Sequence, residues 1–166
     1  MSITLVLGGA RSGKSGLAES LCRGERHYIA TAQAFDSEMK DRIAAHQKQR
    51  GAGWVTHEVV LDLPEALKAA DGAGRVLLVD CLTLWLSNLM LAEADWLAMT
   101  EVLVAALPGL RADVVLVSNE VGLSIVPENA LARRFRDAQG TLNQRVAQAA
   151  DKVIFVAAGL PLTLKG

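Results

Sequence analysis

The stretch that decides the fold is Gly8-Gly9-Ala10-Arg11-Ser12-Gly13-Lys14-Ser15. It fits the pattern G-x-x-x-x-G-K-[ST] and stands between an apolar run typical of a buried strand, residues 3–7, and a segment of helical spacing, residues 14–22. Glycines let a backbone wrap closely around phosphate oxygens, and the N–H groups at a helix start point at the anion. The pattern therefore predicts a P-loop, with Lys14 at the β- and γ-phosphates and the Ser15 hydroxyl on Mg²⁺.

Short apolar runs alternate with segments of helical period along the rest of the chain. Further strands are expected at residues 27–31, 54–60, 75–79, 113–117 and 152–156, the last of these closing the series. Helices are expected at residues 36–50, 63–70, 82–107 (in two pieces) and 128–149. Continuous apolar strands separated by helices predict a mainly parallel sheet covered on both faces, in a single domain over residues 1–166.

The composition excludes several classes of protein. Of the 166 residues, 51% are apolar and 21% charged, which is not the composition of a disordered chain. Seventeen Lys and Arg against 18 Asp and Glu give a net charge of −1, which argues against a nucleic-acid or anionic-membrane partner. The longest uncharged apolar stretches have about a dozen residues, and a membrane span needs about 20. No basic region opens the chain, so we expect no signal peptide and a soluble cytoplasmic protein.

The two cysteines, Cys22 and Cys81, lie in apolar runs without CxxC spacing. This placement predicts core thiols of a reduced protein in preference to a disulfide framework or a zinc site.

Asp80 follows the apolar run at residues 75–79 directly. In P-loop proteins a carboxylate at the end of such a strand holds Mg²⁺. Asp80 could also cap the following helix, and the two roles are compatible in one place, but the P-loop favours the metal-linked role. We therefore predict that Asp80 and Ser15 together form the metal site.

The three histidines have different surroundings. His46 lies among Lys, Arg, Gln and Asp residues on an expected helix, where the pattern alone favours a half-exposed surface histidine over a catalytic group. His27 and His57 lie in expected strands outside any motif, and a structural role is predicted for both.

Polar residues flank the Gly- and Pro-containing loop at residues 121–127. Asn119 and Glu120 precede the loop, and Glu128 and Asn129 follow it. Such side chains either position a substrate hydroxyl or complete a metal shell, or they cap the loop and open the next helix. The pattern does not decide between these interpretations.

Two further groups of residues admit more than one interpretation. Arg133, Arg134 and Arg136 form either a solvated helix face or an anion clamp. The apolar residues at 85–91 and 96–107 favour a core or a subunit interface over a cofactor site.

Several motifs occur together and in a characteristic order. After the P-loop come YIATA at residues 28–32, the stretch at 36–46 that ends in His46, Trp54 with Thr56 and Glu58, VDCLTLWLSNL at 79–89, SNEVGLSIVPEN at 118–129 and LARRFRDAQGTLNQRVAQAAD at 131–151. The chain thereby resembles the bifunctional adenosylcobinamide kinase / adenosylcobinamide-phosphate guanylyltransferase family of cobalamin biosynthesis. The resemblance covers nearly the whole chain and is weakest at residues 90–112.

The resemblance implies an α/β fold, a P-loop NTPase with a RecA-like, mainly parallel sheet flanked by helices. It implies two reactions: phosphorylation of adenosylcobinamide with ATP or GTP, and transfer of GMP from GTP through a guanylyl-histidine to give adenosylcobinamide-GDP. His46 matches the guanylylated histidine, and a neutral imidazole is a competent nucleophile near pH 7. The resemblance also suggests a homo-oligomer, of which a trimer is one form. The nucleotide contacts would be Gly8, Gly9, Ala10, Arg11, Ser12, Gly13, Lys14, Ser15, Ala30, Thr31, Ala32, Gln47, Lys48, Gln49, Arg50, Glu58 and Asp80, with Asn119 and Glu120 at the cobinamide end.

The chain departs from the family pattern in three places. Gly16 stands where many relatives carry Arg, Val59-Val60 replaces Glu-Pro, and Ser124 replaces Gly. A monofunctional small-molecule kinase would share the P-loop and Asp80 and leave His46 without a role. A RecA-like ATPase that binds nucleic acid would share the fold, but the balanced charge and the 4% aromatic content supply neither a basic groove nor a stacking surface.

Overall fold

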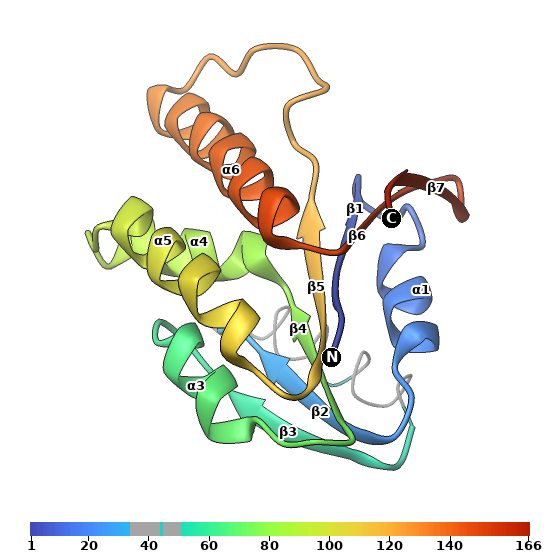
Figure 1. The fold of residues 1–166 in the computed structure, drawn as a ribbon. Coiled ribbons are helices and arrows are strands. Elements are labelled where there is room, and N and C mark those ends of the chain that lie inside the picture. The colour runs from blue at the N-terminus through green and yellow to red at the C-terminus, as the bar shows by residue number, and fades with distance from the viewer. Residues whose placement is uncertain (34–43, 45–50) are drawn as a thin grey trace.

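The computed structural model describes residues 1–33, 44 and 51–166. The expected helix at 36–50, with His46, Gln47, Lys48, Gln49 and Arg50, lies outside the described residues apart from position 44. The described strands form one seven-stranded sheet in the order β3-β2-β4-β5-β1-β6-β7 (Figure 1).

Six of these strands are parallel, as the continuous apolar runs predicted. They are β1 (Ile3–Gly8), β2 (Glu25–Ala30), β3 (Trp54–Glu58), β4 (Arg75–Asp80), β5 (Asp113–Asn119) and β6 (Lys152–Ala157). The crossovers that the structure describes run through helices, and the parallel pairing brings the carboxyl ends of all six strands to one edge of the sheet. The observed bounds differ from the expected ones by one or two residues.

The prediction that residues 152–156 form the last strand is wrong. A seventh strand, β7 (Leu160–Lys165), follows and pairs antiparallel with β6. Ala158 and Gly159 connect the two strands in a tight turn, with φ angles of 51° and 76°. Positive φ at both central residues is what a two-residue hairpin turn requires, and a glycine adopts it without strain.

Helices cover both faces of the sheet (Figure 1). One face carries α1 (Lys14–Leu21), and the other carries α3 (Leu63–Ala70), α4 (Leu82–Leu91), α5 (Trp96–Ala106) and α6 (Ala130–Ala149), with a short 3₁₀ turn, η1 (Leu107–Gly109), after α5. The expected helix at 82–107 is thus two helices, as predicted. The helix expected to begin at residue 128 begins at Ala130, because the Asn129 side chain caps it by accepting from the N–H groups of Leu131 and Ala132.

Alternate residues of the central strands face two separate cores. In β4, Leu77 and Val79 join the larger core under α3 to α6, whereas Val76 and Leu78 join the core under α1. Trp85 of α4 is fully buried, and its indole N–H donates to the Leu61 carbonyl at 2.7 Å. With Trp85, Leu86 and Leu89 all buried, most of the apolar run after Asp80 belongs to the core.

Both cysteines are buried, as predicted. Burial, reinforced by Glu19, raises the pKa of Cys22 to about 12. Burial, reinforced by Asp80, raises the pKa of Cys81 to about 11. Thiols with such high pKa values carry almost no thiolate near neutral pH and are poor nucleophiles.

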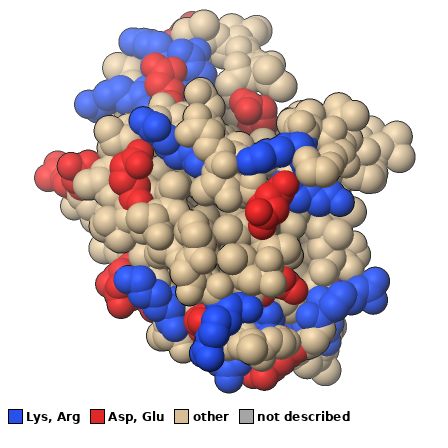
Figure 2. Space-filling model, viewed as in Figure 1, with Lys and Arg blue, Asp and Glu red and all other residues tan. Residues whose placement is uncertain are grey.

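The described surface shows no extended patch of one charge on the face drawn in Figure 2, where Lys and Arg side chains are interspersed with Asp and Glu. Among residues 1–33, 44 and 51–166, no helix is both long enough and apolar enough to cross a membrane.

Candidate functional site

The P-loop joins β1 to α1 at the edge of the sheet where the parallel strands end. Residues of the loop and of the first turns of α1, from Arg11 to Gly16 together with Glu19, surround a hollow of about 510 Å³. The Lys14 ammonium donates to the Gly9 carbonyl at 3.2 Å, which folds its side chain back over the loop. Exposed backbone N–H groups at a helix start and a lysine over a polar hollow are the elements that bind a polyphosphate.

Close packing explains why this loop needs its glycines. A Cβ at Gly8 would lie 2.4 Å from Ser12 Oγ and 2.7 Å from the Val156 carbonyl oxygen. Gly13 has a φ of 94°, and a Cβ there would come within 3.1 Å of Gly159 Cα. Ser12 Oγ is buried and has no hydrogen-bond partner among the described residues. The loop is thus a closely packed cradle with an unused buried hydroxyl.

The turn between β6 and β7 supports the loop from the other side. The Gly159 N–H donates to the Ser12 carbonyl at 2.8 Å. The sequence motif gave no indication of this contact, because 147 positions separate the residues.

Asp80 ends β4 and lies level with Ala30 of β2 and Val117 of β5. The Tyr28 hydroxyl donates to the Asp80 carboxylate at 2.9 Å, which fixes the orientation of this side chain. Helix α1, which begins at Lys14, packs against β4, and its Ala18 lies in one core cluster with Cys81, the residue after Asp80. The predicted P-loop lysine and the predicted acidic residue therefore belong to one site.

The segment after β2 is tied to the end of β4. Thr31 is fully buried, and its hydroxyl donates to the Cys81 carbonyl at 2.7 Å and accepts from the Cys81 N–H at 2.8 Å. Ala30 and Ala32 on either side are half-buried. The Thr31 N–H donates to the Asp80 carbonyl at 3.4 Å, and its carbonyl accepts from Asn88 Nδ2 at 2.8 Å, so Thr31 holds two strand ends together and leaves its neighbours to meet a ligand.

Glu58 ends β3 and pairs in register with Ala30. Its side chain is exposed, and the Val59 N–H that follows donates to the Ala30 carbonyl at 2.8 Å. Register therefore places Glu58, Ala30 and Asp80 side by side across β3, β2 and β4 at the strand-end edge.

Asn119 and Glu120 follow β5 beside the start of the P-loop. Asn119 pairs in register with Gly8, and the Glu120 N–H donates to the Gly8 carbonyl at 3.1 Å. The Asn119 N–H donates to the Thr83 hydroxyl at 2.8 Å. The Glu120 carboxylate accepts from the Gly122 N–H at 2.7 Å, which is the loop-capping interpretation of this residue.

Behind Asn119 lies a buried polar cluster that the sequence did not reveal, formed by Ser118, Gln139 and Asn143. The Ser118 hydroxyl donates to Asn143 Oδ1 at 2.6 Å, and Gln139 Nε2 donates to Ser118 Oγ and to Asn143 Oδ1, both at 3.0 Å. Asn143 Nδ2 in turn donates to the Asn119 carbonyl at 3.1 Å. α6 therefore holds the end of β5 through side-chain amides, although its amphipathic pattern would have predicted only apolar contacts.

His27 and His57 contact each other across β2 and β3. His27 Nδ1 lies 2.9 Å from His57 Nε2, and His27 Nε2 lies 2.9 Å from the Glu25 carboxylate. Burial, then the neighbouring His27 and Arg75, lower the pKa of His57. Within the described ranges no three His, Cys, Asp or Glu side chains are arranged to hold a metal ion.

A mainly parallel sheet with a P-loop after its inner strand β1 and an acidic residue at the end of β4 defines a P-loop nucleotide-binding protein of RecA-like fold. Solved structures with this fold include the P4 protein of bacteriophage phi6, determined in complex with ADP, with a TM-score of 0.53 and 16% identity over 96% of this chain and 52% of the P4 chain. An ATPase from the type III secretion system of pathogenic bacteria gives a TM-score of 0.57 and 12% identity over 98% of this chain and 56% of that chain.

Residues 4–164 match the family described as cobinamide kinase / cobinamide phosphate guanyltransferase, and the chain belongs to this family. The bifunctional adenosylcobalamin biosynthesis protein CobP of Pseudomonas aeruginosa is 49% identical over 98% of this chain and 96% of the relative. The bifunctional adenosylcobalamin biosynthesis protein CobU of Salmonella typhimurium is 42% identical over 97% of this chain and 98% of the relative. The family resemblance seen in the motifs is thus confirmed over nearly the full length.

Proposed function

We propose that this chain carries out both reactions of its family at one nucleotide site, within a single domain. It phosphorylates the aminopropanol hydroxyl of adenosylcobinamide with ATP or GTP, and it then joins GMP from GTP to adenosylcobinamide phosphate, giving adenosylcobinamide-GDP. The observation that carries this proposal is the P-loop cradle, whose helix α1 packs against β4 beside Asp80, in a chain that matches the family over residues 4–164.

In the kinase reaction, Lys14 and the backbone N–H groups of residues 9–15 bind the β- and γ-phosphates. The Ser15 hydroxyl and the Asp80 carboxylate are the oxygen ligands expected for Mg²⁺, which neutralises charge on the transferring phosphoryl group when it is bound. Tyr28 keeps the Asp80 carboxylate in one orientation through its hydrogen bond. The acceptor hydroxyl then approaches from the end of β5, where Asn119 and Glu120 lie beside Gly8.

In the guanylyltransfer reaction, His46 attacks the α-phosphorus of GTP. A nitrogen–phosphorus bond forms, the bond to the β-phosphate oxygen breaks, and pyrophosphate leaves. An oxygen of adenosylcobinamide phosphate then attacks the same phosphorus, and the histidine is released unchanged. We assign Gln47, Lys48, Gln49 and Arg50 to the nucleotide because they follow His46, and Glu58 and residues 30–32 because they lie at the strand-end edge.

We also infer that the protein works as a homo-oligomer, for which a trimer is the arrangement we favour, in the cytoplasm, where its nucleotide substrates are made. Leu97 and Val102 of α5 keep 42% and 48% of their surface exposed, and Leu123 and Ile125 keep 82% and 94%. Exposed apolar side chains in such number favour a subunit contact.

The test is incubation of the protein with α-labelled GTP and Mg²⁺. Guanylyltransfer predicts an acid-labile, alkali-stable label on the protein, which disappears in His46→Ala and persists in the control His57→Ala. Lys14→Ala should lose both this label and the transfer of γ-labelled phosphate to adenosylcobinamide. Transfer of γ-phosphate without any protein label on the wild type would show a kinase alone and refute the second reaction.

A further inference from the structure

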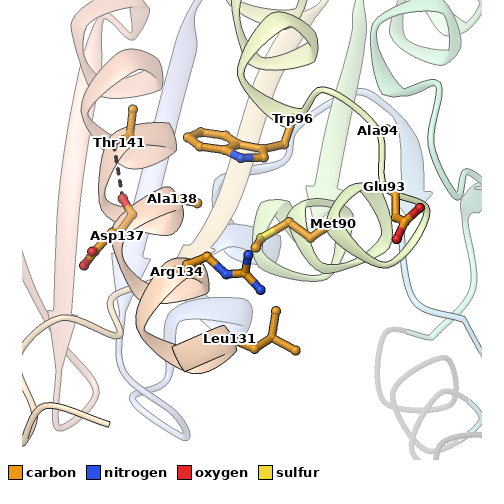
Figure 3. Close-up of a pocket in the computed structure, with 9 residues that line it drawn as sticks. All are labelled: Met90, Glu93, Ala94, Trp96, Leu131, Arg134, Asp137, Ala138 and Thr141. Carbon is orange, nitrogen blue, oxygen red and sulfur yellow. Dashed lines mark hydrogen bonds between the residues drawn. The ribbon is translucent and has the colours of Figure 1, made fainter. Parts of the chain in front are cut away.

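A groove runs between α4, the start of α5 and the first half of α6. One part of it is a hollow of about 540 Å³ whose lining includes Met90, Trp96, Leu131, Arg134 and Ala138 (Figure 3). An adjoining hollow of about 660 Å³ shares Met90, Leu131 and Arg134 with the first and extends to Ser87 and Asn129. We call the two together the α4–α6 groove.

The α4–α6 groove is continuous with the strand-end site. On α4, Thr83, Ser87 and Met90 follow one another at spacings of four and three, which places them on one face of the helix. Thr83 bonds to the Asn119 N–H at the end of β5, Ser87 lines the near end of the groove, and Met90 lies in its centre. The rise of a helix puts Met90 about 10 Å beyond Thr83. Asn129, which caps α6, lines the same hollow as Ser87.

The lining combines apolar surface with one cation that is unpaired among the described residues, and the carboxylates of its Glu93 and Asp137 point away from the space between Trp96, Met90 and Arg134 (Figure 3). Figure 3 shows the Trp96 ring, the Met90 side chain and Leu131 around the hollow, with the Arg134 guanidinium extending between them toward Met90. Arg134 has no hydrogen bond or ion pair within residues 1–33, 44 and 51–166. A guanidinium offers five N–H donors and stacks readily on flat groups. Such a lining suits a large, flat, apolar body that carries carbonyl oxygens at its edge.

The nucleotide does not account for this surface, because the P-loop hollow is lined mainly by Arg11, Lys14, Ser12, Ser15 and glycines. The corrin ring of the acceptor does account for it: its faces are covered by methyl groups and its edge carries carboxamides. We propose that the α4–α6 groove binds the corrin ring of adenosylcobinamide while the aminopropanol arm extends along α4 to Asn119 and the phosphates. The proposal rests on the proposed function and adds the place of its acceptor.

The test measures acceptor binding without turnover. Corrinoids absorb where tryptophan emits, so quenching of the protein fluorescence titrates adenosylcobinamide and gives its Kd. Leu131→Asp places a charge in the groove, and an acidic residue is tolerated in the first turn of a helix. Arg134→Gln removes the guanidinium. Each should raise the Kd and the KM for adenosylcobinamide at least about tenfold, the loss typical of one or two missing contacts, and leave the KM for ATP within twofold.

Leu162→Asp is the matched control, because Leu162 is a similarly exposed leucine on β7 outside both the groove lining and the proposed subunit contact: 59% of Leu162 and 52% of Leu131 is exposed. Its Kd for adenosylcobinamide should stay within twofold of the wild type. The proposal is overturned if both groove variants keep the wild-type Kd. It is also overturned if they change the sedimentation coefficient alone, since the groove then holds a second copy of the chain. A wild type that binds adenosylcobinamide through the groove and yet transfers no phosphate would refute the proposed function and leave the groove assignment intact.

Discussion

The buried polar cluster behind Asn119 provides a strong test of how the strand-end site is held. Asn143→Leu keeps a side chain of similar size on α6 and removes all of its hydrogen bonds. The Ser118 hydroxyl loses its acceptor and the Asn119 carbonyl loses its side-chain donor, whereas Gln139 Nε2 retains Ser118 Oγ. Ser118 and Gln139 are fully buried, so water cannot replace the missing partners.

A buried polar group left without a partner costs about 1–3 kcal/mol. Two such groups give about 2–6 kcal/mol, and burial of the added leucine methyl groups offsets about 1 kcal/mol of this. We therefore expect Asn143→Leu to lower the free energy of unfolding by about 3 kcal/mol. Because part of the cost comes from Ser118, the same substitution in a Ser118→Ala background should cost about 1 kcal/mol less.

Urea denaturation at equilibrium measures these differences, provided that the m-values of all variants agree. Gln144→Leu, at the next and exposed position of α6, is the control and should change the stability by less than about 0.5 kcal/mol. If Asn143→Leu is as stable as this control, or if its cost is the same with and without the Ser118 hydroxyl, the cluster does not hold the end of β5.

Three further outcomes are expected. Gly8→Ala should weaken nucleotide binding in a calorimetric titration, because its Cβ would lie 2.7 Å from the Val156 carbonyl oxygen. Gly16→Ala is the control: a Cβ there has nothing within 4 Å, so this variant should bind nucleotide normally, and its free energy of unfolding should rise by up to about 1 kcal/mol. The free energy of unfolding should decline as the pH falls below about 6.5, because burial, His27 and Arg75 lower the pKa of His57 in the folded protein, so that the unfolded chain takes up a proton that the folded chain does not. Urea midpoints measured against pH should show a smaller decline in His57→Gln. An identical pH profile in this variant would contradict the assignment. Burial raises the pKa of Cys22 to about 12 and that of Cys81 to about 11, so both thiols should resist iodoacetamide at pH 8 in the folded protein and react in urea. Mass spectrometry of the alkylated protein measures this difference, and rapid labelling of the folded chain would contradict their burial.

Local signals in the sequence predicted the framework of the fold. The P-loop pattern located the turn between β1 and α1, and the apolar run before Asp80 located β4, because each depends on residues that are adjacent in the chain. Residues 160–165 carry a usable signal as well: Leu160, Leu162 and Leu164 alternate with other residues after an Ala-Gly pair, the pattern of a hairpin strand. That strand was missed because its side chains are all exposed and form no apolar run.

Contacts between distant residues could not be predicted in the same way. Asn143 and Gln139 have the polarity expected of a solvated helix face, and only the position of β5 beneath α6 makes them buried. Likewise, nothing local indicates that His27 meets His57 thirty positions later, since that contact depends on β2 and β3 being neighbours. The guanylyl role of His46 rests on the family motif and remains a prediction.

The position of β1 in the sheet has a consequence for the order in which the protein takes shape. This strand is made early, yet its two neighbours are β5 and β6, so that Thr4 pairs with Val115 and with Lys152. Pairings across more than a hundred residues slow folding, since most of the chain must be ordered before they form. A growing chain therefore carries β1 as an unsatisfied apolar strand through most of its synthesis and needs protection from aggregation. The Ser12 carbonyl receives its N–H from Gly159 only at the end, so the P-loop gains this support only once the final hairpin has closed.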